Sequence, residues 1–180
     1  CNAEGPMCIA GVFGGLDSGV SDSTTEVFIE SAYFNPVWIR KTAKRHGLST
    51  DASFRYERGI DPDMTPYALK RAALLIRELA GGVVTSAVTD IYPVRIEPFR
   101  FEVSYDRIVR LIGKAIPETT VRKISDALGV TIQSARDGAW QVCVPPYRVD
   151  VRREADLVED ILRIYGYDNV EIPMHVNSTL

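Results

Sequence analysis

The stretch that decides the fold is residues 145–169, PPYRVDVRREADLVEDILRIYGYDN. A rigid Pro-Pro pair opens it, and Gly166 closes it with a residue suited to the left-handed end of a helix. At about 100° per residue, the apolar side chains between them fall in one arc, which predicts an amphipathic helix with a buried face. That face consists of Leu157, Val158, Ile161, Leu162, Ile164 and Tyr165.

Four carboxylates lie on or just before the polar side of this helix. Asp156, Glu159 and Asp160 have the i, i+3 and i+4 spacing of neighbours on one helix face. Asp150 stands just before the helix, where it could cap it or turn toward the same place. Oxygen ligands of this kind suit magnesium or calcium. Arg163 is equally well spaced to pair with this face, so the spacing favours an ion-paired surface and does not establish a metal.

Length and composition are those of an ordinary soluble globular protein. The 180 residues could form one large domain or two small ones, with 46% hydrophobic and 25% charged residues. No apolar run approaches the roughly 20 residues needed to span a bilayer, and no signal peptide is visible. The net charge of −3 argues against a nucleic-acid-binding surface over the whole protein, although a local patch is compatible with it.

The three cysteines suggest neither a metal knuckle nor a disulfide framework. Cys1, Cys8 and Cys143 form no CxxC pair and are odd in number, which favours a reducing cytosol. The sequence begins at a cysteine rather than a methionine, inside what reads as structured sequence. We therefore expect it to be an excised piece of a longer chain.

Hydrophobic patterns in the first ninety residues predict five elements: strands at 8–12, 26–33 and 83–92, and helices at 36–45 and 64–79. The apolar face expected on the second helix is Leu69, Ala72, Ala73, Ile76 and Leu79. Residues 49–61 are dense in charged and small residues, which predicts a loop built for contacts.

Two groups of charged residues in this region allow both a functional and a structural interpretation. Glu30 falls in an otherwise apolar neighbourhood, where a carboxylate is either partnered or functional because burying it unpaired is costly. The helix at 36–45 carries four cations that could contact phosphates or form a solvated face, and the sequence favours neither. These cations are Arg40, Lys41, Lys44 and Arg45.

A second unit is expected after a linker at 93–98. It comprises strands at 99–103, 130–134 and 140–144 and helices at 105–112 and 117–128, followed by the acidic-faced helix. A turn containing Asp137 and Gly138 predicts a hairpin between the last two strands. Two helices followed by a hairpin resemble a winged helix-turn-helix. The candidate recognition helix has only Arg122 and Lys123 as cations, so it is a poor reader of DNA. The overall fold class is α+β.

Three segments together resemble the beta subunit of bacterial phenylalanyl-tRNA synthetases: GVFGG at 11–15, ESAYFNPVWIRKTAKRHGLSTDASFRYERGIDP at 30–62 and the stretch at 145–169. The resemblance implies that residues 1–92 are the C-terminal part of an editing domain, which removes tyrosine from tRNA-Phe. It implies a winged-helix-like domain at 99–172 after the linker, and a tail at 173–180.

The same resemblance implies three pocket residues. Gly14 and Ala52 match small residues that leave room for the misattached aminoacyl group, and Glu30 matches the carboxylate that accepts the tyrosine hydroxyl. A site that hydrogen-bonds a hydroxyl rejects an analogue lacking it because its buried acceptor would be left unpaired. Other family pocket residues lie upstream of Cys1, so the editing site is expected to be incomplete in this chain.

No Ser-His-Asp set is present to hydrolyse an aminoacyl ester, since His46 and His175 are the only histidines. We expect backbone groups and the tRNA ribose to hold the attacking water, and oxyanion stabilisation is also needed. A Phe13 where the family commonly has Met is apolar and changes little.

The resemblance also implies cofactors and partners. It places magnesium ligands, shared with the alpha subunit, at Asp150, Asp156, Glu159 and Asp160, the last replacing a common Glu. It implies an alpha2-beta2 heterotetramer that binds tRNA-Phe, uses ATP in the alpha subunit and is cytoplasmic, with no membrane contact. Two alternatives remain: a winged-helix nucleic-acid-binding regulator, which predicts salt-dependent duplex binding by 99–169, and a free-standing aminoacyl-tRNA deacylase.

Overall fold

The computed structural model describes residues 1–134 and 139–171. The chain divides into two compact units, Cys1–Arg95 and Ile96–Leu180. The expected hairpin turn at Asp137 and Gly138, the tail at 173–180 and His175 lie outside the described residues. No helix in the described residues is long and apolar enough to cross a membrane.

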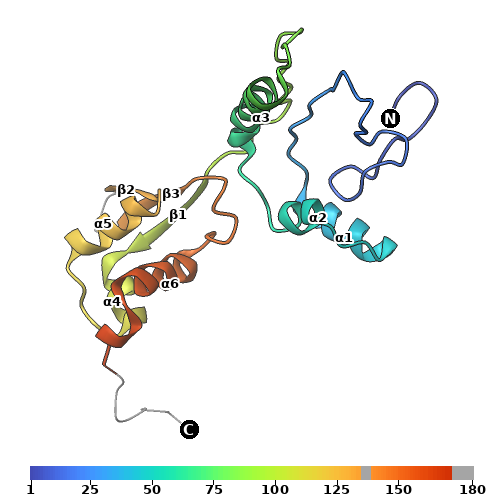
Figure 1. Cartoon of the computed structure of the whole chain (residues 1–180). Helices are drawn as coiled ribbons and strands as arrows, with labels where there is room; N and C mark the ends of the chain where they lie inside the picture. The colour runs from blue at the N-terminus through green and yellow to red at the C-terminus, as the bar shows by residue number, and fades with distance from the viewer. Residues whose placement is uncertain (135–138, 172–180) are drawn as a thin grey trace. The chain divides into compact units, whose positions relative to one another are not determined.

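The second unit is a small antiparallel sheet covered by helices (Figure 1). Strands β1 (Phe99–Ser104), β2 (Thr131–Ser134) and β3 (Ala139–Val144) lie in the order β1-β3-β2. Phe99 pairs with Val144, and Thr131 pairs with Cys143. The helices are α4 (Tyr105–Ile112), α5 (Glu118–Ala127) and α6 (Glu154–Tyr165), followed by the 3-10 turn η3 (Tyr167–Asn169).

One hydrophobic core holds this unit together, and α6 contributes its buried face. Leu157, Val158 and Ile161 are buried there as the apolar arc predicts. Two expectations for α6 are wrong. Ile164, placed on the buried face, is 57% exposed, and Asp160, placed on the polar face, is only 4% exposed. In the last helical turn Leu162 and Tyr165 still pack against the core, whereas Ile164 does not. Arg148 pairs with Asp160, which makes the burial of that carboxylate possible.

The first unit contains helices and long irregular segments. Helix α1 (Pro36–His46) begins at Asn35, whose side chain accepts the Val37 N–H at 3.0 Å, and it ends at Gly47 with φ 64°. Three further elements follow: α2 (Asp51–Tyr56), η1 (Pro62–Met64) and α3 (Thr65–Ala80). The loop expected at 49–61 is therefore wrong in part, because it contains α2.

The strands expected in the first unit are absent from its described residues. The segments 8–12, 26–33 and 83–92 form no ladder, and the bridge there is an isolated one between Ile9 and Phe13. Alternation can mark a strand, but a strand also needs a hydrogen-bonding neighbour. The buried face expected on α3 is also wrong, since none of its residues is buried and Leu79 is 81% exposed. The α+β fold class is confirmed.

Candidate functional site

The GVFGG segment forms a loop whose three glycines meet different surroundings. Gly11 has φ +69°, and a Cβ there would lie 2.6 Å from Ile39 Cδ1. At Gly15 an added Cβ would lie 1.7 Å from the Met7 carbonyl oxygen. At Gly14 it would meet nothing within 4 Å. Packing therefore requires glycine at two positions, whereas Gly14 borders open space.

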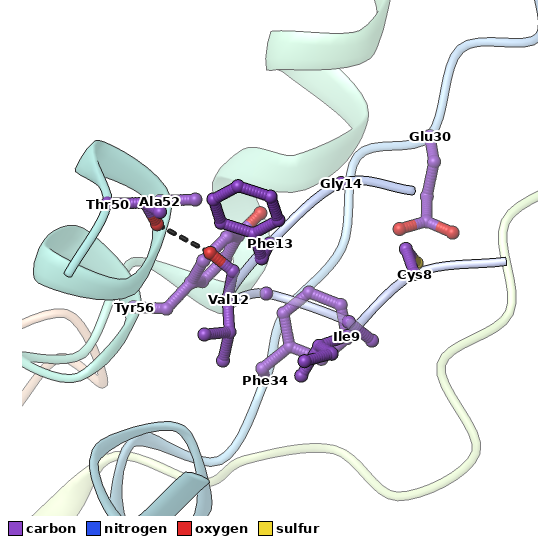
Figure 2. Close-up of a pocket in the computed structure, with 12 residues that line it drawn as sticks. Cys8, Ile9, Val12, Phe13, Gly14, Glu30, Phe34, Thr50, Ala52 and Tyr56 are labelled. Atoms are coloured by element: carbon purple, nitrogen blue, oxygen red, sulfur yellow. Dashed lines mark hydrogen bonds between the residues drawn. The ribbon is translucent and has the colours of Figure 1, made fainter. Parts of the chain in front are cut away.

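That open space is a hollow of about 360 Å³ in the first unit, and it brings together Gly14, Glu30 and Ala52. Figure 2 shows Glu30 on one side of the hollow and Ala52 on the other, with Gly14 between them in this view. Its other lining residues are Cys8, Ile9, Ala10, Gly11, Val12, Phe13, Phe34, Thr50 and Tyr56. Residues from three separate segments thus share one apolar-walled site.

Thr50 links α2 to the loop formed by residues 11–15, the glycine loop. Its side-chain oxygen accepts the Ser53 N–H at 3.1 Å, while the Ser53 hydroxyl accepts the Thr50 N–H at 2.9 Å, which caps the helix reciprocally. The Thr50 hydroxyl also donates to the Val12 carbonyl at 2.5 Å, across 38 residues of sequence. Because Val12 is buried, this bond holds the loop against α2 and sets the position of Ala52 at the wall of the hollow.

The carboxylate of Glu30 is available to a ligand. Contrary to the expected apolar strand, Glu30 lies in an irregular segment and is exposed. Within residues 1–134 and 139–171, no ion pair or hydrogen bond engages it. Figure 2 shows its carboxylate directed toward Cys8 at the edge of the hollow.

Across the hollow, the negative charge of Glu30 affects the ionisation of Tyr56. The pKa of the Tyr56 phenol is raised above 10.0, first by burial and then by the negative charge of Glu30. The Tyr56 ring packs edge-on against Phe34, with centroids 5.0 Å apart. The site therefore combines an anionic acceptor with aromatic walls, an arrangement that can receive an aromatic group bearing a hydroxyl donor.

Sequence reasoning missed the roles of Thr50, Phe34 and Tyr56 in this site. Thr50 and Ser53 have the spacing of a helix cap, and that signal could have identified α2. Nothing local in the sequence indicates that Phe34 and Tyr56 meet. The described residues hold no Ser-His-Asp set, and His46 is exposed at the end of α1.

The acidic helix of the second unit is a separate candidate site. Asp160 pairs with Arg148, and its other oxygen lies 3.4 Å from Arg163 Nη1. Arg163 also pairs with Glu159 at 2.6 Å, and Arg148 Nε lies 3.6 Å from Asp150. The charge of the buried Asp160 is therefore compensated by the partly buried Arg148.

Asp156 accepts hydrogen bonds at the N-terminus of α6, so its carboxylate caps the helix rather than being free to bind a metal. Its carboxylate accepts the backbone N–H groups of Arg152 and Arg153, each at 3.1 Å. The residue preceding the helix as its cap is Arg153, so Asp150 is not the N-cap.

These contacts do not fit a magnesium ion held by this chain alone. Among the described residues, no group of three or more His, Cys, Asp or Glu could hold a metal. The four expected ligands are instead divided between arginine pairs and a helix end. Magnesium would have to compete with those arginines for oxygens that are already engaged.

Comparison with known proteins follows the division into two units. Residues 1–81 match the B3/4 domain family, and residues 101–167 match the tRNA synthetase B5 domain family. The whole chain is 57% identical over 180 residues to the phenylalanine–tRNA ligase beta subunit of Bacteroides thetaiotaomicron. It is 47% identical over 181 residues, again along its whole length, to the beta subunit of Porphyromonas gingivalis. The chain covers 22% of each of these proteins, so it spans about a fifth of their length.

A similar solved structure is an N-terminal fragment of the phenylalanyl-tRNA synthetase beta subunit from Pyrococcus horikoshii. It is 27% identical, and the match covers 43% of this chain and 22% of that chain. The TM-score of the match is 0.37.

Proposed function

We propose that this chain, which belongs to the phenylalanine–tRNA ligase beta-subunit family, contributes part of an editing pocket for tyrosine misattached to tRNA-Phe. The observation that carries the proposal is the hollow shared by Gly14, Glu30 and Ala52, with an unengaged carboxylate at its edge. In this role Glu30 accepts the tyrosine hydroxyl, while Gly14 and Ala52 leave space for the ring.

In this role Glu30 distinguishes tyrosine from phenylalanine by binding the tyrosine hydroxyl, not by transferring a proton. Phenylalanine has no hydroxyl, so its entry would place an apolar ring edge against the carboxylate without a hydrogen bond. Hydrolysis forms a bond from water oxygen to the ester carbonyl carbon and breaks the carbonyl–ribose oxygen bond, and the ribose oxygen takes the proton. The residues described above orient the aminoacyl group for that step and supply no nucleophile of their own.

The rest of the proposal concerns the assembled enzyme. It would be an alpha2-beta2 heterotetramer in the cytoplasm, charging tRNA-Phe with phenylalanine at the expense of ATP. Residues 1–92 would form the editing part and 99–172 the scaffold, joined at 93–98. Magnesium would act in that enzyme. Because the acidic side chains of α6 are paired with arginines, we assign no step to a metal held here.

Glu30 can be tested directly in the assembled alpha–beta enzyme. Glu30→Ala should lower the rate of tyrosyl-tRNA-Phe deacylation about tenfold to a hundredfold. This range corresponds to the loss of one hydrogen bond to a charged group, which contributes about 1.5–3 kcal/mol. Phenylalanylation should stay unchanged. Glu26→Ala is the matched control, because Glu26 is exposed in the same segment and does not line the hollow. Undiminished deacylation in Glu30→Ala would remove Glu30 from this role.

The structure favours neither alternative. On α5, Arg122 pairs with Glu118 at 2.9 Å and lies 4.5 Å from the Trp140 ring centroid, so it is engaged within the protein. This leaves Lys123 as the other cation on a helix that would have to read a duplex groove. A free-standing deacylase would not need the second unit, and hydrolysis of tyrosyl-tRNA-Phe by this chain alone would identify one; we expect no such activity.

A further inference from the structure

We propose that one face of α1 binds the RNA backbone beside the hollow. This basic face consists of Arg40, Lys41, Lys44 and Arg45, with Trp38 in the same arc. At about 100° per residue, these side chains lie opposite Ile39 and Ala43, which are buried. All four cations are exposed, and in the described part of the chain none of them forms an ion pair.

The charge on this face is local rather than a property of the chain. Residues 35–58, which cover α1 and α2, hold six Lys or Arg against two Asp or Glu, whereas the whole chain has a net charge of −3. Helix α1 carries no acidic residue. The helix dipole accounts for cations in the last turn, such as Lys44 and Arg45, but not for Arg40 and Lys41 nearer the middle. A concentrated cationic face of this kind attracts phosphates.

Exposed aromatic rings accompany the cations. Trp38 is 65% exposed, with Lys41 Nζ 5.0 Å from its ring centroid. On α2, Phe54 is 55% exposed, with the Arg58 guanidinium 3.6 Å from its ring centroid. Aromatic rings and guanidinium planes beside a cationic track are the elements with which proteins hold unpaired RNA bases and their backbone.

Helix α1, which carries the basic face, adjoins the hollow through the residue before its cap and through α2. Phe34 lies directly before the α1 cap, and Thr50, Ala52 and Tyr56 belong to α2 or its cap; all four line the hollow. Helices α1 and α2 are in contact and lie side by side (Figure 1). An aminoacyl group in the hollow is esterified to the terminal ribose. Ile39 and Ala43 pack toward the hollow-lining Val12, so the basic face on the opposite side of α1 would meet the backbone where the RNA passes around the helix. This step rests on the proposed function, whereas the charge and aromatic arguments do not.

The test measures binding of labelled, uncharged tRNA to the full chain by fluorescence anisotropy at several salt concentrations. Replacing the four cations of the basic face with Gln should make the slope of log K against log[salt] shallower by about 3, since each phosphate contact contributes roughly 0.7–0.9. Trp38→Ala should weaken binding about tenfold with the slope unchanged. Circular dichroism should show the native helix content in each variant, because the replaced side chains are exposed.

A matched control removes the same charge elsewhere in the first unit. It replaces Lys70, Arg71, Arg77 and Arg95, which are also exposed, with Gln. The control should change the slope by less than about 1. The inference is overturned if the wild-type chain does not bind tRNA, if the basic-face variant keeps the full slope, or if the control loses as much. Glu30→Ala should leave tRNA binding intact, so failure of the editing proposal and failure of this one give different results.

Discussion

The two units differ in how much apolar surface they bury. In the described part of the second unit, fourteen buried hydrophobic residues from the strands, the three helices and the segments between them form one core. In the first unit, among the described residues, the core is Val12, Ile39 and Ala43, with four partly buried neighbours. Large apolar side chains such as Leu16 and Phe28 are 97% and 95% exposed there. Hydrophobic patterning is a sound guide to burial where elements pack on one another, and a poor guide where they do not.

This contrast also separates the two candidate sites. The hollow of the first unit is held by a few specific contacts, such as the Thr50–Val12 hydrogen bond, rather than by a deep core. The acidic helix of the second unit is anchored by a well-packed face, and its carboxylates are paired. A site open to ligand thus lies in the less buried unit.

The largest expected effect tests whether the core of the second unit is more deeply buried than that of the first. Leu157→Ala should lower the free energy of unfolding of the second unit by about 2–5 kcal/mol, because Leu157 is fully buried. Ile39→Ala should cost the first unit less, about 1–2 kcal/mol, because its shallow core can collapse around the change. Native-state hydrogen exchange of each unit's amides measures both values.

Ile164→Ala is the control on α6, and it should change stability by less than about 0.5 kcal/mol because Ile164 is largely exposed. An equal cost for Ile39→Ala and Leu157→Ala would contradict the contrast between the units.

A smaller effect is expected in the glycine loop. Gly15→Ala should destabilise the first unit by about 1–3 kcal/mol, because the new methyl group would overlap the Met7 carbonyl and force the backbone apart. Gly14→Ala is the matched control and should be nearly neutral, since its methyl group would enter open space. Exchange rates of amides in α1 and α2 measure the difference. If both variants are equally stable, the close approach at Gly15 does not hold in solution.

The smallest effect concerns pH and the second unit. Hydrogen bonds from the Arg152 backbone N–H, together with Arg153, hold the pKa of Asp156 below its ordinary value of 3.8. A lowered folded-state pKa stabilises the fold above the ordinary value, and that contribution disappears as pH falls through the folded-state pKa. Asp156→Asn should therefore cost about 0.5–1 kcal/mol at pH 7 and flatten the dependence of stability on pH below 4.

Urea unfolding between pH 2 and 7 measures this dependence, and Asp168→Asn, at an exposed position, serves as control. A curve for Asp156→Asn parallel to that of the unchanged protein would contradict the expected role.

Local signals predicted much of the second unit correctly. The helix over residues 154–165, with its stop at Gly166, follows from apolar spacing and a glycine, and both features act within one or two turns. The same is true of α1, where Asn35 caps one end and Gly47 closes the other. In contrast, the strands expected at 26–33 and 83–92 required partners that local alternation does not supply.

For the candidate site residues too, the sequence and the tertiary structure supply different information. Gly14, Glu30 and Ala52 were named through a family resemblance, and their proposed roles remain predictions. That the three line one hollow depends on contacts between distant segments, including the Thr50 bond to the glycine loop. Asp160 illustrates the opposite error: helix spacing places it on the polar face, but Arg148, twelve residues earlier, pairs with it and allows its burial.

The sequence by itself determined the α+β class, the helices with clear caps and the buried face of α6, because these depend on spacing within a few residues. Only the tertiary structure decided which carboxylates are paired, which glycine borders open space and which apolar patterns are buried. Those outcomes depend on atoms brought together from distant segments, and the free energy of such contacts is not encoded in local periodicity.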